Sequence, residues 1–110
     1  MKVSEFIIVT TKETSYKTTE LRPRIVCNDG FNISVQAGTG SYSSPRKTAF
    51  EYATVELGFP SEEEGLINEY AEYTEDYTNT VYGHTPIDVI EAVIKKHGGI
   101  NVKKTFIKDE

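Results

Sequence analysis

Short runs of bulky and β-branched residues, separated by turn-forming residues, predict several strands in the first half of the chain. One such run lies in residues 2–10 and predicts the first strand. Two more runs, residues 24–27 and 31–37, flank Asn28-Asp29-Gly30, which favours a tight turn because these residue types tolerate positive φ. The second of the two alternates apolar and polar residues, so the pair should form a hairpin with one face on a core.

Further strands are predicted later in the chain. Residues 38–46 contain glycines, serines and a proline, and they predict a loop. Residues 49–59 return to strand character, with alternating apolar and polar residues in their second half. Residues 80–82 predict one more short strand, and residues 100–107 predict a closing strand.

Two helices are predicted from their capping residues and apolar spacing. Residues 61–72 begin with a serine that can cap a helix, and Glu64 lies at the capping-box position. Residues 86–97 start with a proline after a threonine and end before a glycine. Residues 1–110 are thus predicted to form a single α+β domain, with a mainly antiparallel sheet of about four to six strands and these two helices.

The net charge of −5 hides an uneven distribution of charge along the chain. Residues 1–47 and 95–110 each carry a net charge of +3, whereas residues 48–94 contain eleven acids and no lysine or arginine. The overall sign disfavours direct binding of nucleic acid, because phosphate contacts need a basic surface. The acidic middle of the chain favours a basic partner instead.

The remaining composition predicts a cytoplasmic protein. The apolar run from Phe6 to Val9 is too short for a signal-peptide core or a membrane span, so no membrane contact is expected. Cys27 is the only cysteine, so no internal disulfide can form. A reducing compartment is the natural setting for such a chain.

Acids and tyrosines are interleaved in the middle of the chain, and we interpret this stretch as a binding surface. The residues predicted to contact a partner are Glu62, Glu63, Glu69, Tyr70, Glu72, Tyr73, Glu75, Asp76 and Tyr77. Acids and tyrosines without compensating lysines suit a basic, partly apolar groove on another protein. The alternative is a solvated face that only keeps the protein in solution.

A ligand-binding alternative rests on the glycine-rich loop. Its backbone amides, together with arginines, could hold a phosphate group. The residues proposed for this role are Arg22, Arg24, Ser43, Ser44 and Arg46. The loop lacks the spacing of a nucleotide-binding P-loop and is not followed by a predicted helix.

Catalytic and metal-binding chemistry find little support in the sequence. Cys27 or a serine of the glycine-rich loop could meet His84, with Asp88 as an orienting group, but no nucleophile-elbow motif is present. Cys27 lies in an apolar strand, where a buried thiol is unreactive. His84 and His97 belong to no metal-binding motif, and His97 is expected to complement the C-terminal dipole of its helix. No catalytic residue, metal or cofactor is therefore assigned.

Seven short motifs are distributed between residues 25 and 100. They are CNDGF (27–31), SVQA (34–37), SPR (44–46), VELGFPS (55–61), YAE (70–72), VYG (81–83) and KHGGI (96–100). This pattern resembles a family of small proteins encoded by bacteriophages and prophages. The resemblance implies a phage setting inside a bacterial cell and transfers no site residue, since the family has no assigned activity.

The phage setting and the charge pattern together predict a function. By analogy with small acidic phage proteins, the chain is expected to inhibit a host defence or nucleic-acid-handling protein, such as a CRISPR effector with a basic channel. We expect a binding protein and not an enzyme. The alternatives are a sponge that sequesters a nucleotide immune signal and a small hydrolase without a recognisable motif. The sequence leaves the oligomeric state and the partner's identity open.

Overall fold

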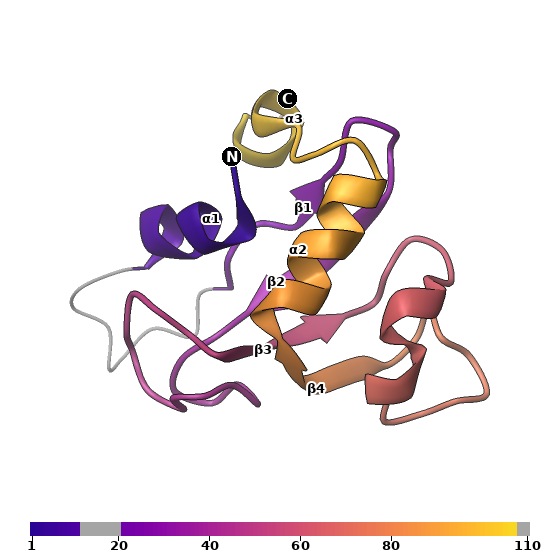
Figure 1. Ribbon diagram of the computed structural model, residues 1–110, viewed down its shortest axis with the longest axis horizontal. Helices are drawn as coiled ribbons and strands as arrows, with labels where there is room; N and C mark the ends of the chain where they lie inside the picture. Colours follow the sequence, from indigo (N-terminus) through magenta and orange to yellow (C-terminus); the bar gives the residue numbers. More distant parts are fainter. Residues whose placement is uncertain (12–20, 108–110) are drawn as a thin grey trace.

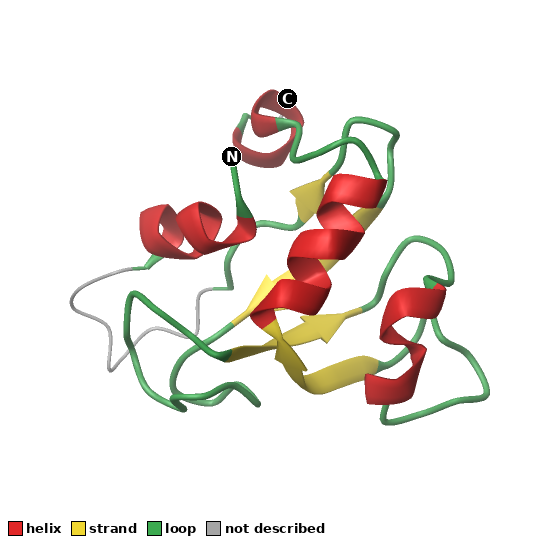
Figure 2. Cartoon of the chain, viewed as in Figure 1, coloured by secondary structure: helices red, strands yellow, loops and turns green. Residues whose placement is uncertain are grey.

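The sheet of this protein is a four-stranded antiparallel meander (Figures 1 and 2). The computed structural model describes residues 1–11 and 21–107. The strands are β1 (Ile25–Val26), β2 (Asn32–Gln36), β3 (Thr54–Gly58) and β4 (Val81–Pro86), and each pairs with the next along the chain. The predicted α+β class with an antiparallel sheet is confirmed.

The predicted hairpin is formed by β1 and β2. Its register pairs Ile25 with Ile33. Gly30 adopts a φ of 98°, which only glycine reaches without strain. The amide of Gly30 donates to the carbonyl of Cys27 at 3.0 Å, and the amide of Cys27 donates to the carbonyl of Phe31 at 2.8 Å. The turn prediction from Asn28-Asp29-Gly30 is therefore confirmed.

The predicted strand over residues 49–59 is confirmed only in its second half. Val55 and Leu57 of β3 are fully buried, as their alternation predicted. Residues 49–53 form irregular structure instead, because Tyr52 turns inward and its hydroxyl accepts a hydrogen bond from the amide of Ala49 at 2.8 Å. The short strand predicted over residues 80–82 corresponds to the start of the longer β4.

The predicted C-terminal helix is present as α2 (Ile87–Lys96), which lies across one face of the sheet (Figure 1). Ile90, Val93 and Ile94 form its buried side. Within the described parts of the chain, no helix is both long and apolar enough to cross a membrane.

The helix predicted over residues 61–72 is wrong in extent and type. The structure has only a 3-10 helix, η1 (Gly65–Tyr70). Ser61 does not cap it, because the Ser61 hydroxyl accepts a hydrogen bond from the amide of Asn32 at 3.0 Å, which ties this segment to β2. Glu64 is the capping residue instead, and its carboxylate accepts from the amide of Leu66 at 3.0 Å.

The strand predicted over residues 2–10 is also wrong, because this segment forms helix α1 (Val3–Thr10). Val3, Phe6 and Ile7 are buried at helical spacing, while Ile8 and Val9 are exposed. The carboxylate of Glu91 on α2 accepts hydrogen bonds from the Val3 amide at 2.7 Å and the Ser4 amide at 3.2 Å. A contact from a distant helix therefore satisfies the start of α1.

The closing strand predicted over residues 100–107 is replaced by α3 (Val102–Phe106). Only Ile100 pairs as a strand residue would, through an isolated bridge to Cys27. The Asn101 side chain then caps the helix by accepting from the amide of Lys104 at 2.9 Å. Buried Thr105 accepts a hydrogen bond from the amide of Val26 at 3.0 Å, so a side chain takes the place of a strand partner.

Candidate functional site

The predicted partner-binding residues lie in one continuous stretch, residues 62–77, which we call the acidic segment. It includes η1 and the loop that leads to β4, at the β4 edge of the sheet (Figure 1). Six of its acids are exposed to solvent: Glu62, Glu63, Glu69, Glu72, Glu75 and Asp76. The seventh, Glu64, is turned inward and is only 2% exposed.

The loop of the acidic segment is held in place by hydrogen bonds to the strand that follows it. The amide of Glu72 donates to the carbonyl of Val81 at 3.0 Å, and the amide of Tyr73 donates to the Thr80 hydroxyl at 2.9 Å. The hydroxyl of fully buried Tyr82 donates to the carbonyl of Tyr77. The exposed acids of this loop therefore project from an ordered backbone.

Apolar surface accompanies the exposed acids. Tyr73 is 49% exposed and Leu66 of η1 is 47% exposed, while Phe59 just before the segment is 46% exposed. Tyr70 and Tyr77 are half-buried. The Tyr73 hydroxyl donates to the Glu75 carboxylate at 2.8 Å, which raises the pKa of Tyr73. A surface of acids with exposed aromatic and aliphatic groups suits protein contact better than acids alone.

The exposed charge of the acidic segment is not neutralised within the described residues. In residues 1–11 and 21–107, the only acid of the segment with an ion pair is Glu64, which lies 3.0 Å from Lys96 Nζ. None of the six exposed acids has a basic partner among those residues. Their field is therefore directed toward solvent.

A second group of charged residues lies at the base of the acidic segment, and we call Asp29, Glu64, Lys96 and His97 the His97 cluster. His97 Nδ1 is 2.7 Å from Asp29 Oδ2, and His97 Nε2 is 2.8 Å from Glu64 Oε1. The Phe31 ring stacks on the imidazole with centroids 4.1 Å apart. Because ionised carboxylates only accept hydrogen bonds, this geometry favours the doubly protonated imidazolium form of His97.

The pKa values of this cluster follow from its geometry. Burial alone would lower the pKa of His97, but the hydrogen bonds to Glu64 and Asp29 outweigh burial and raise it. Burial alone would raise the pKa of Glu64, but its bonds to the Leu66 amide, His97 and Lys96 lower it. The pKa of Asp29 is lowered by the Phe31 amide and by His97.

The His97 cluster joins three parts of the fold that are far apart in sequence. Asp29 belongs to the hairpin turn, Glu64 caps the start of η1, and Lys96 and His97 lie at the end of α2. The cluster therefore fixes the start of the acidic segment against the core. No spacing in the sequence connects positions 29, 64 and 97. The charge pattern therefore predicted the acidic segment but not the His97 cluster that holds its start in place.

The arginines of the ligand-binding alternative do not converge. Arg22 donates to the carbonyl of Ala37 at 2.6 Å, and Arg24 donates to the carbonyl of Phe59. Burial lowers the pKa of Arg22 and of Arg24. Arg46 lies elsewhere, over the Tyr42 ring at 4.9 Å. The first two guanidinium groups are thus used in stabilising the fold.

The serines of that alternative differ from each other in exposure. Ser43 is 2% exposed, and its hydroxyl is used in hydrogen bonds within its own loop. The Ser44 hydroxyl lies 3.5 Å from His84 Nδ1, and the hydroxyl of Thr54 lies closer to the same atom, at 3.2 Å. Asp88 does not orient His84 through any hydrogen bond among the described residues.

Cys27 lies in the core and is 1% exposed. Burial and the nearby Asp29 carboxylate raise its pKa to about 11. A thiol in this environment is protonated at neutral pH and is a poor nucleophile.

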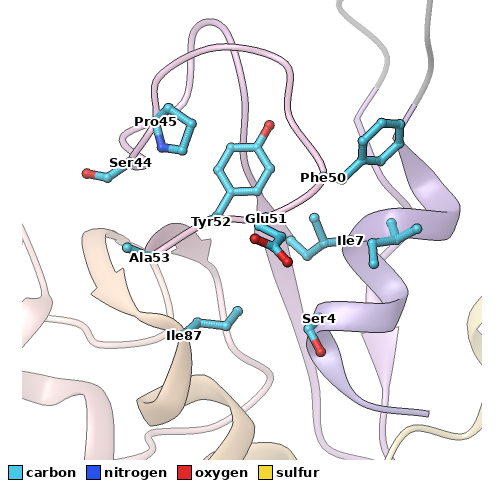
Figure 3. Close-up of a pocket in the computed structure, with 10 residues that line it drawn as sticks. Ser4, Ile7, Ser44, Pro45, Phe50, Glu51, Tyr52, Ala53 and Ile87 are labelled. Carbon is cyan, nitrogen blue, oxygen red and sulfur yellow. The ribbon is translucent and has the colours of Figure 1, made fainter.

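One cavity, lined by α1, by the loop before β3 and by the start of α2, is large enough for a small molecule (Figure 3). The described residues that line it include Glu51 but no lysine, arginine or histidine. It therefore offers a phosphate group no basic side chain from this part of the chain.

Comparison with known proteins identifies no relative. The chain matches no protein-family model, no curated protein and no solved structure.

Proposed function

We propose that this chain is a phage-encoded binding protein that inhibits a host defence or nucleic-acid-handling protein through its acidic segment. The observation that carries the proposal is the set of six exposed acids in the acidic segment, none of which has a basic partner among the described residues. The phage origin rests on the motif pattern of the sequence.

The physical basis of the proposal is complementarity with a basic surface. The exposed acids attract a basic partner over a distance set by the Debye length, about 8 Å at physiological ionic strength. Tyr73 and Leu66 supply apolar area that a contact can bury once the charges have brought the two surfaces together. A channel that binds nucleic acid has the required positive charge, and an occupied channel cannot bind its substrate.

The sponge alternative receives less support from the geometry. A sponge needs basic groups around a pocket, but Arg22 and Arg24 donate hydrogen bonds to backbone carbonyls. The lining of the cavity contains the acidic Glu51. The acidic segment has the opposite sign from a phosphate-binding site.

The proposal is tested by affinity capture from bacterial lysate with variants of equal net charge. The test variant carries Glu69→Gln, Glu72→Gln and Glu75→Gln, which raises the net charge from −5 to −2. The control carries Thr39→Lys, Thr48→Lys and Ala92→Lys at exposed positions outside the segment, and it has the same net charge.

The test variant should bind the captured protein about tenfold more weakly than the wild type, and the control should retain nearly full binding. The wild type should also inhibit the nucleic-acid binding of the captured protein. If both variants lose binding equally, only net charge matters. If both keep it, the acidic segment is a solvated face and the proposal is wrong.

A further inference from the structure

The cavity is formed by three separate segments. Ser4, Ile7 and Ile8 of α1 form one wall, and Ser44, Pro45 and residues 50–53 form a second wall. Ile87 at the start of α2 closes the third side (Figure 3). The cavity has a volume of about 780 Å³, which lies in the range of sites that hold small organic molecules.

Most of the lining is apolar. Ile7 is 1% exposed and Tyr52 is 7% exposed, so both belong to the packed floor. The Tyr52 hydroxyl is used internally, since it donates to the carbonyl of Lys47 at 2.8 Å. Ile8 and Phe50 are 46% and 54% exposed, and they offer apolar surface at the rim. A ligand with an apolar body would bury this surface.

One carboxylate, that of Glu51, lines the cavity, and its residue is exposed to solvent. Glu51 lies in the middle of the lining, between the α1 side chains and Ile87 (Figure 3). Among the described residues, no group donates a hydrogen bond to it and no basic side chain lines the cavity. A neutral ligand would gain nothing from the charge of Glu51, and an anion would be repelled by it. A cation would form a charge-assisted hydrogen bond instead.

We propose that this cavity binds a small hydrophobic amine, with the ammonium group on Glu51 and the apolar body against Ile7, Ile8 and Phe50. Two features determine the class of ligand. The concave apolar wall favours a ligand with a compact apolar part, and the single carboxylate favours a ligand with one positive charge. Figure 1 places α1 and the acidic segment on opposite sides of α2, so this site is separate from the proposed partner surface.

The proposal is tested with three ligands that share one chain length: octylamine, octanol and octanoate. Binding is followed by the backbone amide NMR spectrum of the full chain, below the concentration at which any of the three forms micelles. Octylamine should bind saturably, with shifts centred on α1, residues 50–53 and Ile87. It should bind about tenfold more tightly than octanol, and octanoate should not bind.

The variant Glu51→Gln keeps the shape of the side chain and removes its charge. It should weaken octylamine binding about tenfold and leave octanol binding unchanged. The control Asp88→Asn removes an exposed acid next to Ile87 that does not line the cavity, and it should leave both affinities unchanged. An unchanged amide spectrum away from residue 51 establishes that the variant is folded.

Four outcomes would overturn the proposal. Octylamine binding that does not saturate would mean that the cavity is not a specific site. Octylamine binding no tighter than octanol binding would mean that Glu51 does not contribute to affinity. Shifts centred on the acidic segment would mean that the amine is only a counterion there. Saturable binding of a lysine-containing apolar peptide at this site, without binding of octylamine, would make the cavity a peptide-docking groove.

Discussion

Replacing His97 by glutamine should destabilise the protein by about 2–3 kcal/mol. The variant keeps a side chain of similar reach but cannot carry a charge or donate to Asp29 and Glu64 at once. It also loses the stacked contact with Phe31, whose ring lies 4.1 Å from the imidazole. Glu64, only 2% exposed, is then left with Lys96 as its one charged partner in the described part of the chain.

The magnitude follows from the burial of Glu64. A hydrogen bond between charged groups contributes about 1.5–3 kcal/mol, and removing the partner of a buried charge costs about 3–5 kcal/mol. The expected loss lies at the lower end because Lys96 Nζ remains near Glu64, at 3.0 Å from Oε1 in the wild type. A loss of this size is a large fraction of the stability of a small domain, which is about 5–15 kcal/mol.

The effect should depend on pH with a definite sign. The pKa of His97 is raised above its ordinary value of 6.5, so its contribution is complete below pH 6.5 and is lost as pH rises through the raised pKa. The pKa of Glu64 is lowered from 4.5, so its contribution is complete above pH 4.5 and is lost as pH falls through the lowered pKa. The stabilisation by the cluster is therefore greatest between pH 4.5 and 6.5.

Urea unfolding at about pH 5.5 and about pH 9 measures both parts of this prediction. The free energy of unfolding of the wild type should exceed that of His97→Gln by about 2–3 kcal/mol at the lower pH. At the higher pH the difference should be clearly smaller. The control His84→Asn alters the exposed histidine, whose positive φ asparagine tolerates, and it should change stability by no more than about 0.5 kcal/mol. A loss below about 1 kcal/mol for His97→Gln, or a difference that is the same at both pH values, would refute the reasoning.

Three further predictions concern the fold. Gly30→Val should cost about 1 kcal/mol or more, seen as a lower melting temperature, because its φ of 98° strains a β-branched residue although no atom lies within 4 Å of the added carbon. Cys27 should react slowly with a thiol reagent at neutral pH, because a pKa of about 11 leaves it almost entirely protonated, and rapid labelling would contradict its burial. Glu91→Gln should cost about 1 kcal/mol in urea unfolding by weakening the bonds to the Val3 and Ser4 amides, and no change would count against the observed start of α1.

The parts of the fold that the sequence predicted well are those specified by local chemistry. The hairpin depends on a turn that needs a glycine at positive φ, and α2 depends on its own caps and apolar face. The alternation in β3 correctly placed Val55 and Leu57 in the core. In each case, residues close together in the sequence determine the local structure.

The two errors at the chain ends have a common cause. The apolar and β-branched residues of 2–10 and 100–107 favour strands by local propensity, but tertiary contacts decide the structure of these segments. Glu91 satisfies the amides at the start of α1, and Thr105 bonds to β1 in place of a paired strand. The spacing of Val3, Phe6 and Ile7 was the available indication of a helix.

In the candidate site, too, the features set by neighbouring residues were predicted and those set by distant contacts were not. The charge pattern located the acidic segment, and six of its acids are exposed. The inward turn of Glu64 could not be predicted, because its reason is a contact with His97, thirty-three positions away. Likewise, the cavity joins α1, a loop and α2, and its α1 wall was expected to be a strand.

The most direct test of the proposed function is the salt dependence of binding to the captured partner, measured for the wild type and for a charge reversal. The reversal carries Glu69→Lys, Glu72→Lys and Glu75→Lys, all exposed, so the far-UV circular dichroism spectrum should stay unchanged. Wild-type association should be fastest at low salt and slow down as salt screens the charges, and the reversal should abolish binding. Binding that is indifferent to salt, or a folded reversal that still binds, would contradict the proposal that the acidic segment is the functional surface.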